Sequence, residues 1–199
     1  ALGYEALYTN TQGDRNTAVG HQALYTMNPS GNADSYNTAV GFYALYANTI
    51  GYRNTAVGGL SLDALVTGNN NTAIGYAAAT SRTSGNDNVA VGAYCMNAAA
   101  TANHNTAVGK SAMHDLTTGS ENTAVGLNAL FAVTTGYNNV AIGYRALDAA
   151  TTVHSCIAIG YDALAATNTG NSNVAIGRAA MGANTGGSGV ALGACLLYT

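Results

Sequence analysis

The residues of this chain that could carry out chemistry do not come together in a recognisable arrangement. The four histidines differ in their spacing from the regularly repeated glycines, so they predict no row of metal ligands, and we expect His104, His114 and His154 to face solvent. The acidic residues are equally scattered and form no carboxylate pair at a repeating place, and the calcium-binding repeat G-G-x-G-x-D does not occur. Serine, histidine and aspartate are all present, but nothing local suggests a catalytic triad. We therefore expect no enzyme, no cofactor and no bound metal.

The three cysteines also lack the spacing of a site. Cys95, Cys156 and Cys195 contain no C-x-x-C pair and are odd in number, so they predict neither a disulfide framework nor a zinc site. Cys95 stands where other repeats carry alanine, which favours a small buried side chain. The sequence leaves the redox state of the three thiols open.

A fixed period is the dominant feature of the chain. Twelve glycines close the same short phrase, as in Asn54 to Gly58 or Asn173 to Gly177, and nine of the eleven gaps between them are 17 residues, with one of 21 and one of 16. Such a period over a whole chain predicts stacked repeats rather than an ordinary globular core. We expect these glycines to form a structural ladder: Gly3, Gly20, Gly41, Gly58, Gly75, Gly92, Gly109, Gly126, Gly143, Gly160, Gly177 and Gly193.

Each repeat keeps its residue types at fixed places. The third residue after the glycine is small and the fourth is usually Leu or Met, after which comes a polar stretch of Thr, Asn and Gly. The closing phrase alternates as a strand does, with Thr or Val and Val or Ile on one face and Ala on the other. The frequent glycines and Asn/Thr/Gly clusters argue against helices. The sequence predicts an all-β fold, a parallel β-solenoid of about twelve 17-residue coils, each with two short strands and two turns.

A row of asparagines precedes the expected strands. Asparagine has both donors and acceptors, so stacked amides can bond to one another along the axis, and this structural role is favoured over a ligand-binding row. The row comprises Asn16, Asn37, Asn54, Asn71, Asn88, Asn105, Asn122, Asn139 and Asn173.

Composition narrows the class of protein. The 199 residues are 48% hydrophobic and 8% charged with a net charge of −3, which favours a folded chain and offers no basic surface for nucleic acid. No apolar stretch approaches the roughly 20 residues of a membrane span. Because the chain starts and stops inside a repeat without a cap, we expect residues 1–199 to be a single solenoid segment of a longer fibrous protein.

The repeated phrase N-[TV]-A-[VI]-G-x-x-[AS]-L resembles the head repeats of YadA-type trimeric autotransporter adhesins. It is also similar to the N-T-A-V-G-x-x-A-L arrays of phage tail-fibre proteins and bacterial surface fibres, and the likeness covers every coil. The resemblance implies a left-handed parallel β-roll, three copies of which pack around a common axis. The coil is a few residues longer than in the adhesins, and Thr often replaces the first Val.

Two departures from the regular pattern could contact a partner. The long repeat carries an insertion, residues 27–36, whose Pro29 and Asp34 could belong to a receptor-contact loop, although a plain protruding turn is favoured. Aromatic residues recur one and five places after the glycine, and a subunit interface is favoured over sugar binding for them. They include Tyr4, Tyr8, Tyr25, Phe42, Tyr46, Tyr76, Phe131, Tyr144, Tyr161 and Tyr198.

These features favour a structural or adhesive fibre segment, the shaft or head of a trimeric phage tail fibre or bacterial surface adhesin. We expect an extracellular homotrimer, continued end to end in the fibre, with a cell-surface glycan or receptor as its partner and with no nucleic acid and no membrane insertion. The alternative is a monomeric ice-binding solenoid that uses the threonine row Thr17, Thr38, Thr55, Thr72, Thr106 and Thr123.

Overall fold

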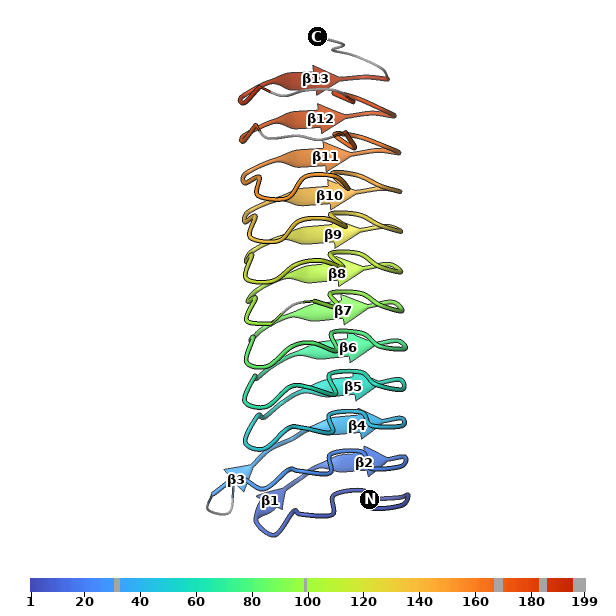
Figure 1. Cartoon of the computed structure of the whole chain (residues 1–199), viewed down its shortest axis with the longest axis vertical. Coiled ribbons are helices and arrows are strands. Elements are labelled where there is room, and N and C mark those ends of the chain that lie inside the picture. The colour runs from blue at the N-terminus through green and yellow to red at the C-terminus, as the bar shows by residue number, and fades with distance from the viewer. Residues whose placement is uncertain (31–32, 99, 167–169, 183–185, 195–199) are drawn as a thin grey trace.

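The structure is a single column of short stacked strands (Figure 1). It is a computed structural model that describes residues 1–30, 33–98, 100–166, 170–182 and 186–194, and these residues contain no helix. The strands are β1 (Gly13–Asp14), β2 (Thr17–Val19), β3 (Ala33–Asp34), β4 (Thr38–Val40), β5 (Thr55–Val57), β6 (Thr72–Ile74), β7 (Val89–Val91), β8 (Thr106–Val108), β9 (Thr123–Val125), β10 (Val140–Ile142), β11 (Ile157–Ile159), β12 (Val174–Ile176) and β13 (Val190–Leu192).

Eleven of these strands form one parallel sheet, in the order β13-β12-β11-β10-β9-β8-β7-β6-β5-β4-β2. Successive strands pair without any slip, so that Ala141 of β10 lies between Ala124 of β9 and Ala158 of β11. Equivalent residues of successive repeats therefore form ladders along the axis. This register confirms the predicted parallel β-solenoid with 17-residue coils.

The expectation of two strands in each coil is wrong, because a regular coil has one three-residue strand and returns through turns. The physical reason is a repeated left-handed backbone. In the regular coil between Gly41 and Gly58, the residues Tyr43, Leu45 and Arg53 have φ values of 56°, 52° and 55°. Such residues interrupt an extended run. The turns still bond from coil to coil, as where the N–H of Leu24 donates to the carbonyl of Ala44 at 3.0 Å.

The glycine that closes each strand has a steric role. Gly143 has a φ of 132°, and a Cβ built on it would lie 2.5 Å from the carbonyl oxygen of Gly160 in the next coil. A side chain at this place would have to push two stacked backbones apart. The period of the glycines therefore reflects the close approach of one coil to the next.

The core lies inside the coils. In a representative coil it contains the strand alanine Ala141 and the small and large residues Ala146 and Leu147, all fully buried. A further core place, seven residues after the glycine, was not predicted because its residue type varies. Its buried occupants are Met27, Asn48, Leu65, Arg82, Leu116, Val133 and Ala150.

The insertion at residues 27–36 builds an extra two-stranded sheet beside the column. β3 pairs in parallel with β1, with Gly13 opposite Ala33 and Asp14 opposite Asp34, and both strands lie at the lower left in Figure 1. Pro29 is buried, whereas Asp34 is exposed. The expected protruding turn is thus partly packed against the preceding coil, and Pro29 offers no surface contact within this chain.

Candidate functional site

The predicted asparagine ladder lies inside the solenoid. Eight of its nine members are buried, and Asn16 is half-buried. The N–H of Asn105 donates to Oδ1 of Asn88 at 3.0 Å, its Nδ2 donates to the carbonyl of Gly119 at 3.0 Å, and its Oδ1 accepts the N–H of Asn122 at 3.0 Å. The amide of Asn105 therefore satisfies backbone groups of neighbouring coils and is not available to a ligand, whereas Nδ2 of Asn16 has no acceptor among the described residues.

Cysteine takes one place in this ladder. The N–H of Cys156 donates to Oδ1 of Asn139 at 3.0 Å, as an asparagine would, while its buried Sγ lies 3.5 Å from the carbonyl of Gly170. Burial raises the pKa of the Cys156 thiol, and it raises the pKa of Cys95 to about 12. Both thiols are therefore protonated and unreactive at neutral pH. Cys195 lies outside the described residues.

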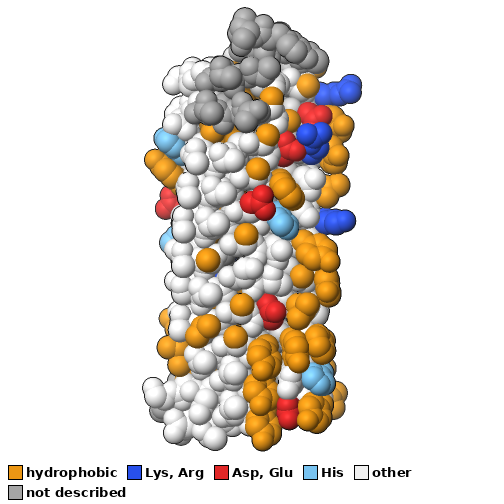
Figure 2. Space-filling view, viewed as in Figure 1, with side chains coloured by type: hydrophobic (Ala, Val, Ile, Leu, Met, Phe, Trp, Pro, Cys, Tyr) orange, Lys and Arg blue, Asp and Glu red, His pale blue; other side chains and the backbone are white. Residues whose placement is uncertain are grey.

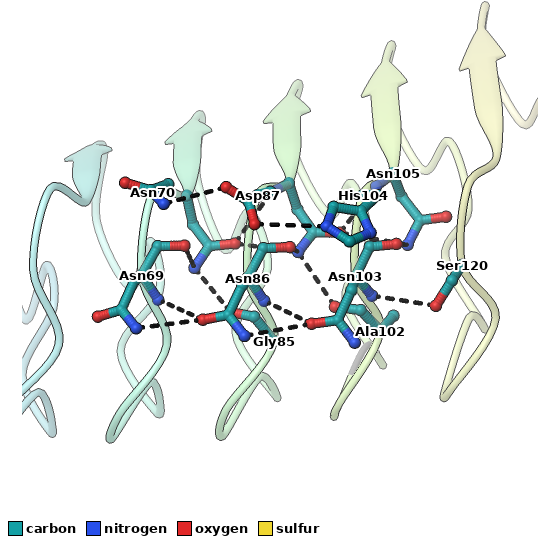
Figure 3. A network of polar contacts seen from close by, with 12 residues as sticks. Asn69, Asn70, Gly85, Asn86, Asp87, Ala102, Asn103, His104, Asn105 and Ser120 are labelled. Carbon is teal, nitrogen blue, oxygen red and sulfur yellow. Dashed lines mark hydrogen bonds and ion pairs between the residues drawn. The ribbon is translucent and has the colours of Figure 1, made fainter.

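A second polar ladder, not predicted from the sequence, runs along the turn before the strands (Figure 3). The N–H of Asn69 donates to Oδ1 of Asn86 at 2.9 Å, the N–H of Asn86 donates to Oδ1 of Asn103 at 2.8 Å, and the N–H of Asn103 lies 3.4 Å from Oγ of Ser120. The equivalent residue is tyrosine in two other coils, Tyr52 and Tyr137, so the place has no constant residue type.

Exposed polar residues lie beside this second ladder. Nδ2 of Asn70 donates to Oδ1 of Asp87 at 3.0 Å, and Oδ2 of Asp87 lies 3.4 Å from Nε2 of His104 (Figure 3). Because these side chains are about half exposed, water screens the ion pair, and its contribution to stability is small.

The other two histidines expected to face solvent pack against aromatic rings instead. His114 stacks on Phe131 with ring centroids 5.0 Å apart, and its Nδ1 lies 2.7 Å from Oδ1 of Asp115. His154 stacks on Tyr137 at 4.7 Å. The expectation of solvated histidines holds for His104 and is wrong for His114, whose side chain is 29% exposed, and for the half-buried His154.

The tyrosines five places after the glycine form a stacked row. The ring centroids of Tyr8 and Tyr25 are 5.4 Å apart, and those of Tyr25 and Tyr46 are 5.2 Å apart, with interplanar angles of 6° and 15°. Figure 2 shows hydrophobic side chains gathered in vertical bands over the N-terminal coils at the lower right. The coil period places these rings in register along the axis.

A second row, one place after the glycine, runs beside the first. His21 stacks between Tyr4 and Phe42, with centroids 5.1 and 5.4 Å away. Tyr43 links the two rows, since its ring centroid lies 4.0 Å from that of Phe42 and 4.9 Å from that of Tyr46. The two rows form one aromatic surface on the N-terminal coils.

The stacking decides what this aromatic surface can bind. A sugar ring that packs on an aromatic residue needs an open ring face, but Tyr25 has Tyr8 on one face and Tyr46 on the other. Such a row presents ring edges and hydroxyl groups to solvent. It suits contact with another protein surface better than stacking of a glycan.

The residues of the insertion form a separate cluster. Nη1 of Arg15 lies 2.5 Å from Oδ2 of Asp34 and also donates to the hydroxyl of Tyr36, whose ring lies 5.3 Å from the guanidinium carbon. No hydrogen bond, ion pair or ring contact among the described residues joins Pro29 or Asp34 to the tyrosine row. The structure therefore does not bring the expected surface-contact residues together at one site.

One column of side chains on the outer face of the large sheet is apolar along its length. The last residue of each main strand points outward, and several of these side chains are 36–41% exposed: Val19, Val57, Ile74, Val108, Val125, Ile142 and Ile176. We call this column the outer apolar row. The first strand residues, Thr, Val or Ile, form a parallel column beside it, because the alanine between the two columns points inward.

Within the described residues, there is no pocket, no cluster of three potential metal ligands and no helix able to cross a membrane. The chain matches no protein-family model, no curated protein and no solved structure.

Proposed function

We propose that this chain is a structural or adhesive fibre segment, the shaft or head of a trimeric phage tail fibre or bacterial surface adhesin that presents a host- or surface-binding tip. The proposal combines the resemblance of the repeated phrase to such fibres with the parallel solenoid. In it, the coils are left-handed, three copies pack side by side outside the cell, and the solenoid continues end to end in the fibre. A cell-surface glycan or receptor is the partner of the tip.

The outer apolar row carries this proposal. One Val, Ile or Leu side chain per coil points out of the sheet, at the constant spacing of parallel strands, so the apolar stripe runs the length of the column. Continuous apolar stripes of this kind favour association. Closed threefold symmetry would cover the stripe on every copy and leave no apolar surface exposed for further association.

The neighbouring column becomes more apolar towards the C-terminal coils. Thr17, Thr38 and Thr55 occupy it in the first main strands, whereas Val140, Ile157 and Val174 occupy it in β10, β11 and β12. In the proposed trimer, the C-terminal part of the interface is therefore more apolar and holds less water than the N-terminal part.

The oligomeric state tests the proposal. Sedimentation velocity and native mass measurement of residues 1–199 should give a homotrimer. The double variant Val108→Lys/Val125→Lys places two charges in the outer apolar row, where the native side chains are each 37% exposed, so the coil should fold while the trimer dissociates.

The matched control is Thr118→Lys/Thr135→Lys. Both threonines lie in exposed turns of the same region of the column, so these two lysines should leave the trimer intact. A wild-type chain that stays a stable monomer at high concentration would contradict the proposal. Equal dissociation of both double variants would show that the outer apolar row is not the interface.

A monomeric ice-binding solenoid is the second candidate, because the sheet presents Thr72 and Ile74, for example, side by side on an outward face that repeats in register. Against it, valine or isoleucine replaces threonine in β7, β10, β11, β12 and β13. Thermal hysteresis in a dilute solution of the monomer would favour this function, and its absence would remove it.

A further inference from the structure

Arg82 is a cation buried in the core of the solenoid. It lies seven residues after Gly75, where other coils bury Leu65, Leu116 or Val133, and its side chain is fully buried. None of the ion pairs among the described residues involves it. Arginine is rarely buried without an acidic partner, because a charge removed from water must be compensated.

The guanidinium group of Arg82 forms hydrogen bonds through Nη1 alone. Nη1 donates to the carbonyl of Ala102 at 3.0 Å and lies 3.4 Å from Oδ1 of Asn71, and both of these oxygens are neutral. Nε and Nη2 are buried and have no acceptor among the described residues. In a guanidinium, the N–H groups of Nε and Nη2 point in the same direction and form a two-donor fork. One acceptor in front of this fork could receive both hydrogen bonds.

The charge of Arg82 persists at neutral pH. Burial lowers its pKa to about 10, which is still well above 7. A water molecule in front of the fork would accept hydrogen bonds but would leave the positive charge uncompensated. An anion would accept the hydrogen bonds and would also compensate the positive charge. It would be held by charge-assisted hydrogen bonds in a medium of low dielectric constant.

The coil of Arg82 is also unusual in its packing. Four residues after the glycine it carries the buried Ala79, where the equivalent residue in other described coils is Leu or Met. The smaller side chain leaves more of the coil interior to the guanidinium and its ligand. Because Arg82 is fully buried and the described residues show no pocket, any ligand of the fork must be small and enclosed within the coils.

We propose that the Nε/Nη2 fork of Arg82 binds a small monovalent anion of the halide class, such as chloride, inside the solenoid. The anion compensates the buried charge and holds the coil of Arg82 against the next coil, which supplies Ala102. This proposal does not depend on the fibre function or on the oligomeric state.

Thermal unfolding in two sodium salts tests the site. The wild-type chain is refolded in sodium chloride or in sodium gluconate of equal ionic strength, since gluconate is too large to be enclosed. An anion that binds the folded state alone raises its stability, so Tm should be several degrees higher in chloride and should level off as chloride increases.

Two variants separate this effect from a general salt effect. Arg82→Met removes the charge and the fork but keeps a long unbranched side chain, so its Tm should be the same in the two salts. Arg53→Met removes an exposed arginine and should keep the wild-type difference. Equal Tm values of the wild-type chain in both salts, or an undiminished chloride effect in Arg82→Met, would overturn the proposal.

A crystallographic measurement covers the case in which Arg82→Met does not fold. Crystals of wild-type chain refolded in sodium bromide should show an anomalous difference peak within hydrogen-bond distance of Nε and Nη2. Density at the fork without an anomalous signal would identify water and refute the anion site. Bromide peaks confined to the surface would mean an adventitious ion only.

Discussion

Asparagine is used in this solenoid as a connector between backbones. Asn105 is fully buried, and its side chain joins Gly119 and Asn122 through hydrogen bonds of 3.0 Å. A hydrophobic residue of similar size would fill the space but leave the carbonyl and the N–H without partners. The ladder is therefore a condition for stacking, because a buried backbone group without a partner is costly.

The variant Asn105→Ala should lower the free energy of unfolding by about 2–6 kcal/mol, since two buried backbone groups lose their partners at about 1–3 kcal/mol each. Urea unfolding followed by circular dichroism measures the loss. Thr118→Ala, in an exposed turn of the next coil, is the control and should change stability by less than about 0.5 kcal/mol. Similar small losses in both variants would show that the ladder does not support the stack.

Cys95 gives the stability a dependence on alkaline pH. Burial raises the pKa of its thiol from 9.0 to about 12. The folded chain therefore holds a proton that the unfolded chain loses above pH 9. The contribution is fully present below pH 9 and is lost as the pH rises towards 12, with a slope of up to about 1.4 kcal/mol per pH unit.

The variant Cys95→Ala isolates the contribution of the Cys95 thiol to the pH dependence of stability, because alanine occupies the same place in most other coils. Between about pH 8 and about pH 10.5, the wild-type chain should lose about 2 kcal/mol more stability than the variant. Tyrosines titrate in the same range, but they are common to both chains and cancel in the difference. Parallel losses in the two chains would show that Cys95 is not held protonated by folding.

At the scale of the element, the strand was predictable and the turn was not. The phrase N-T-A-V-G alternates in hydrophobicity and ends on glycine, so its three central residues could be assigned to a strand with alanine inward. The rest of the coil contains left-handed residues such as Leu24 and Leu45, with φ values of 52° in both. Sequence reasoning assigns this backbone to glycine or asparagine, not to a buried leucine.

Places with variable residue types were missed for a related reason. The core place seven residues after the glycine contains Leu65 in one coil and Arg82 in the next, and the second polar ladder contains Asn69 or Tyr52. At the core place the recurring feature is a backbone hydrogen bond within the coil, as from the N–H of Leu65 to the carbonyl of Leu62 and from the N–H of Leu116 to the carbonyl of Met113. A constant residue type arises in the ladders where one side chain alone fits, as with the closing glycines.

The left-handed turns allow a stabilising substitution. Ser155 is exposed and has a φ of 58°, a conformation that costs a side-chain-bearing residue roughly 1–2 kcal/mol and costs glycine none. Glycine also loses more conformational freedom on folding. Ser155→Gly should therefore leave stability unchanged or raise it by up to about 1 kcal/mol in urea unfolding.

Ser81→Gly is the matched control, because Ser81 is exposed and is not among the residues with a positive φ. This variant should lose about 0.5–1 kcal/mol, since the substitution relieves no strain. Equal losses at both serines would contradict the left-handed turn at Ser155.

At the scale of the whole molecule, the chain is a one-dimensional stack in which each coil contacts the coils before and after it. Each strand of the main sheet pairs with the strands of the coils before and after it, and among the described residues the contacts between strands join adjacent coils alone. The free energy of unfolding should then be the sum of the intrinsic stability of each coil and the stabilisation from each contact between neighbouring coils. Such a stack tolerates the loss of a complete repeat, provided that the ladders stay in phase.

Deletion of residues 106–122 removes 17 residues and joins Asn105 to Thr123, so that the phrase N-T-A-V-G is restored. β9 should then pair with β7 in the register that β8 uses in the native chain, because Thr106 and Thr123 are equivalent. We expect the shortened chain to keep its β-type circular dichroism spectrum and one cooperative transition, with Tm lower by a few degrees. Deletion of residues 110–117, about half a coil, places strand residues against a turn and should abolish the transition. A 17-residue deletion that unfolds the chain as completely as the half-coil deletion would show that the stack is not held together by interchangeable coils.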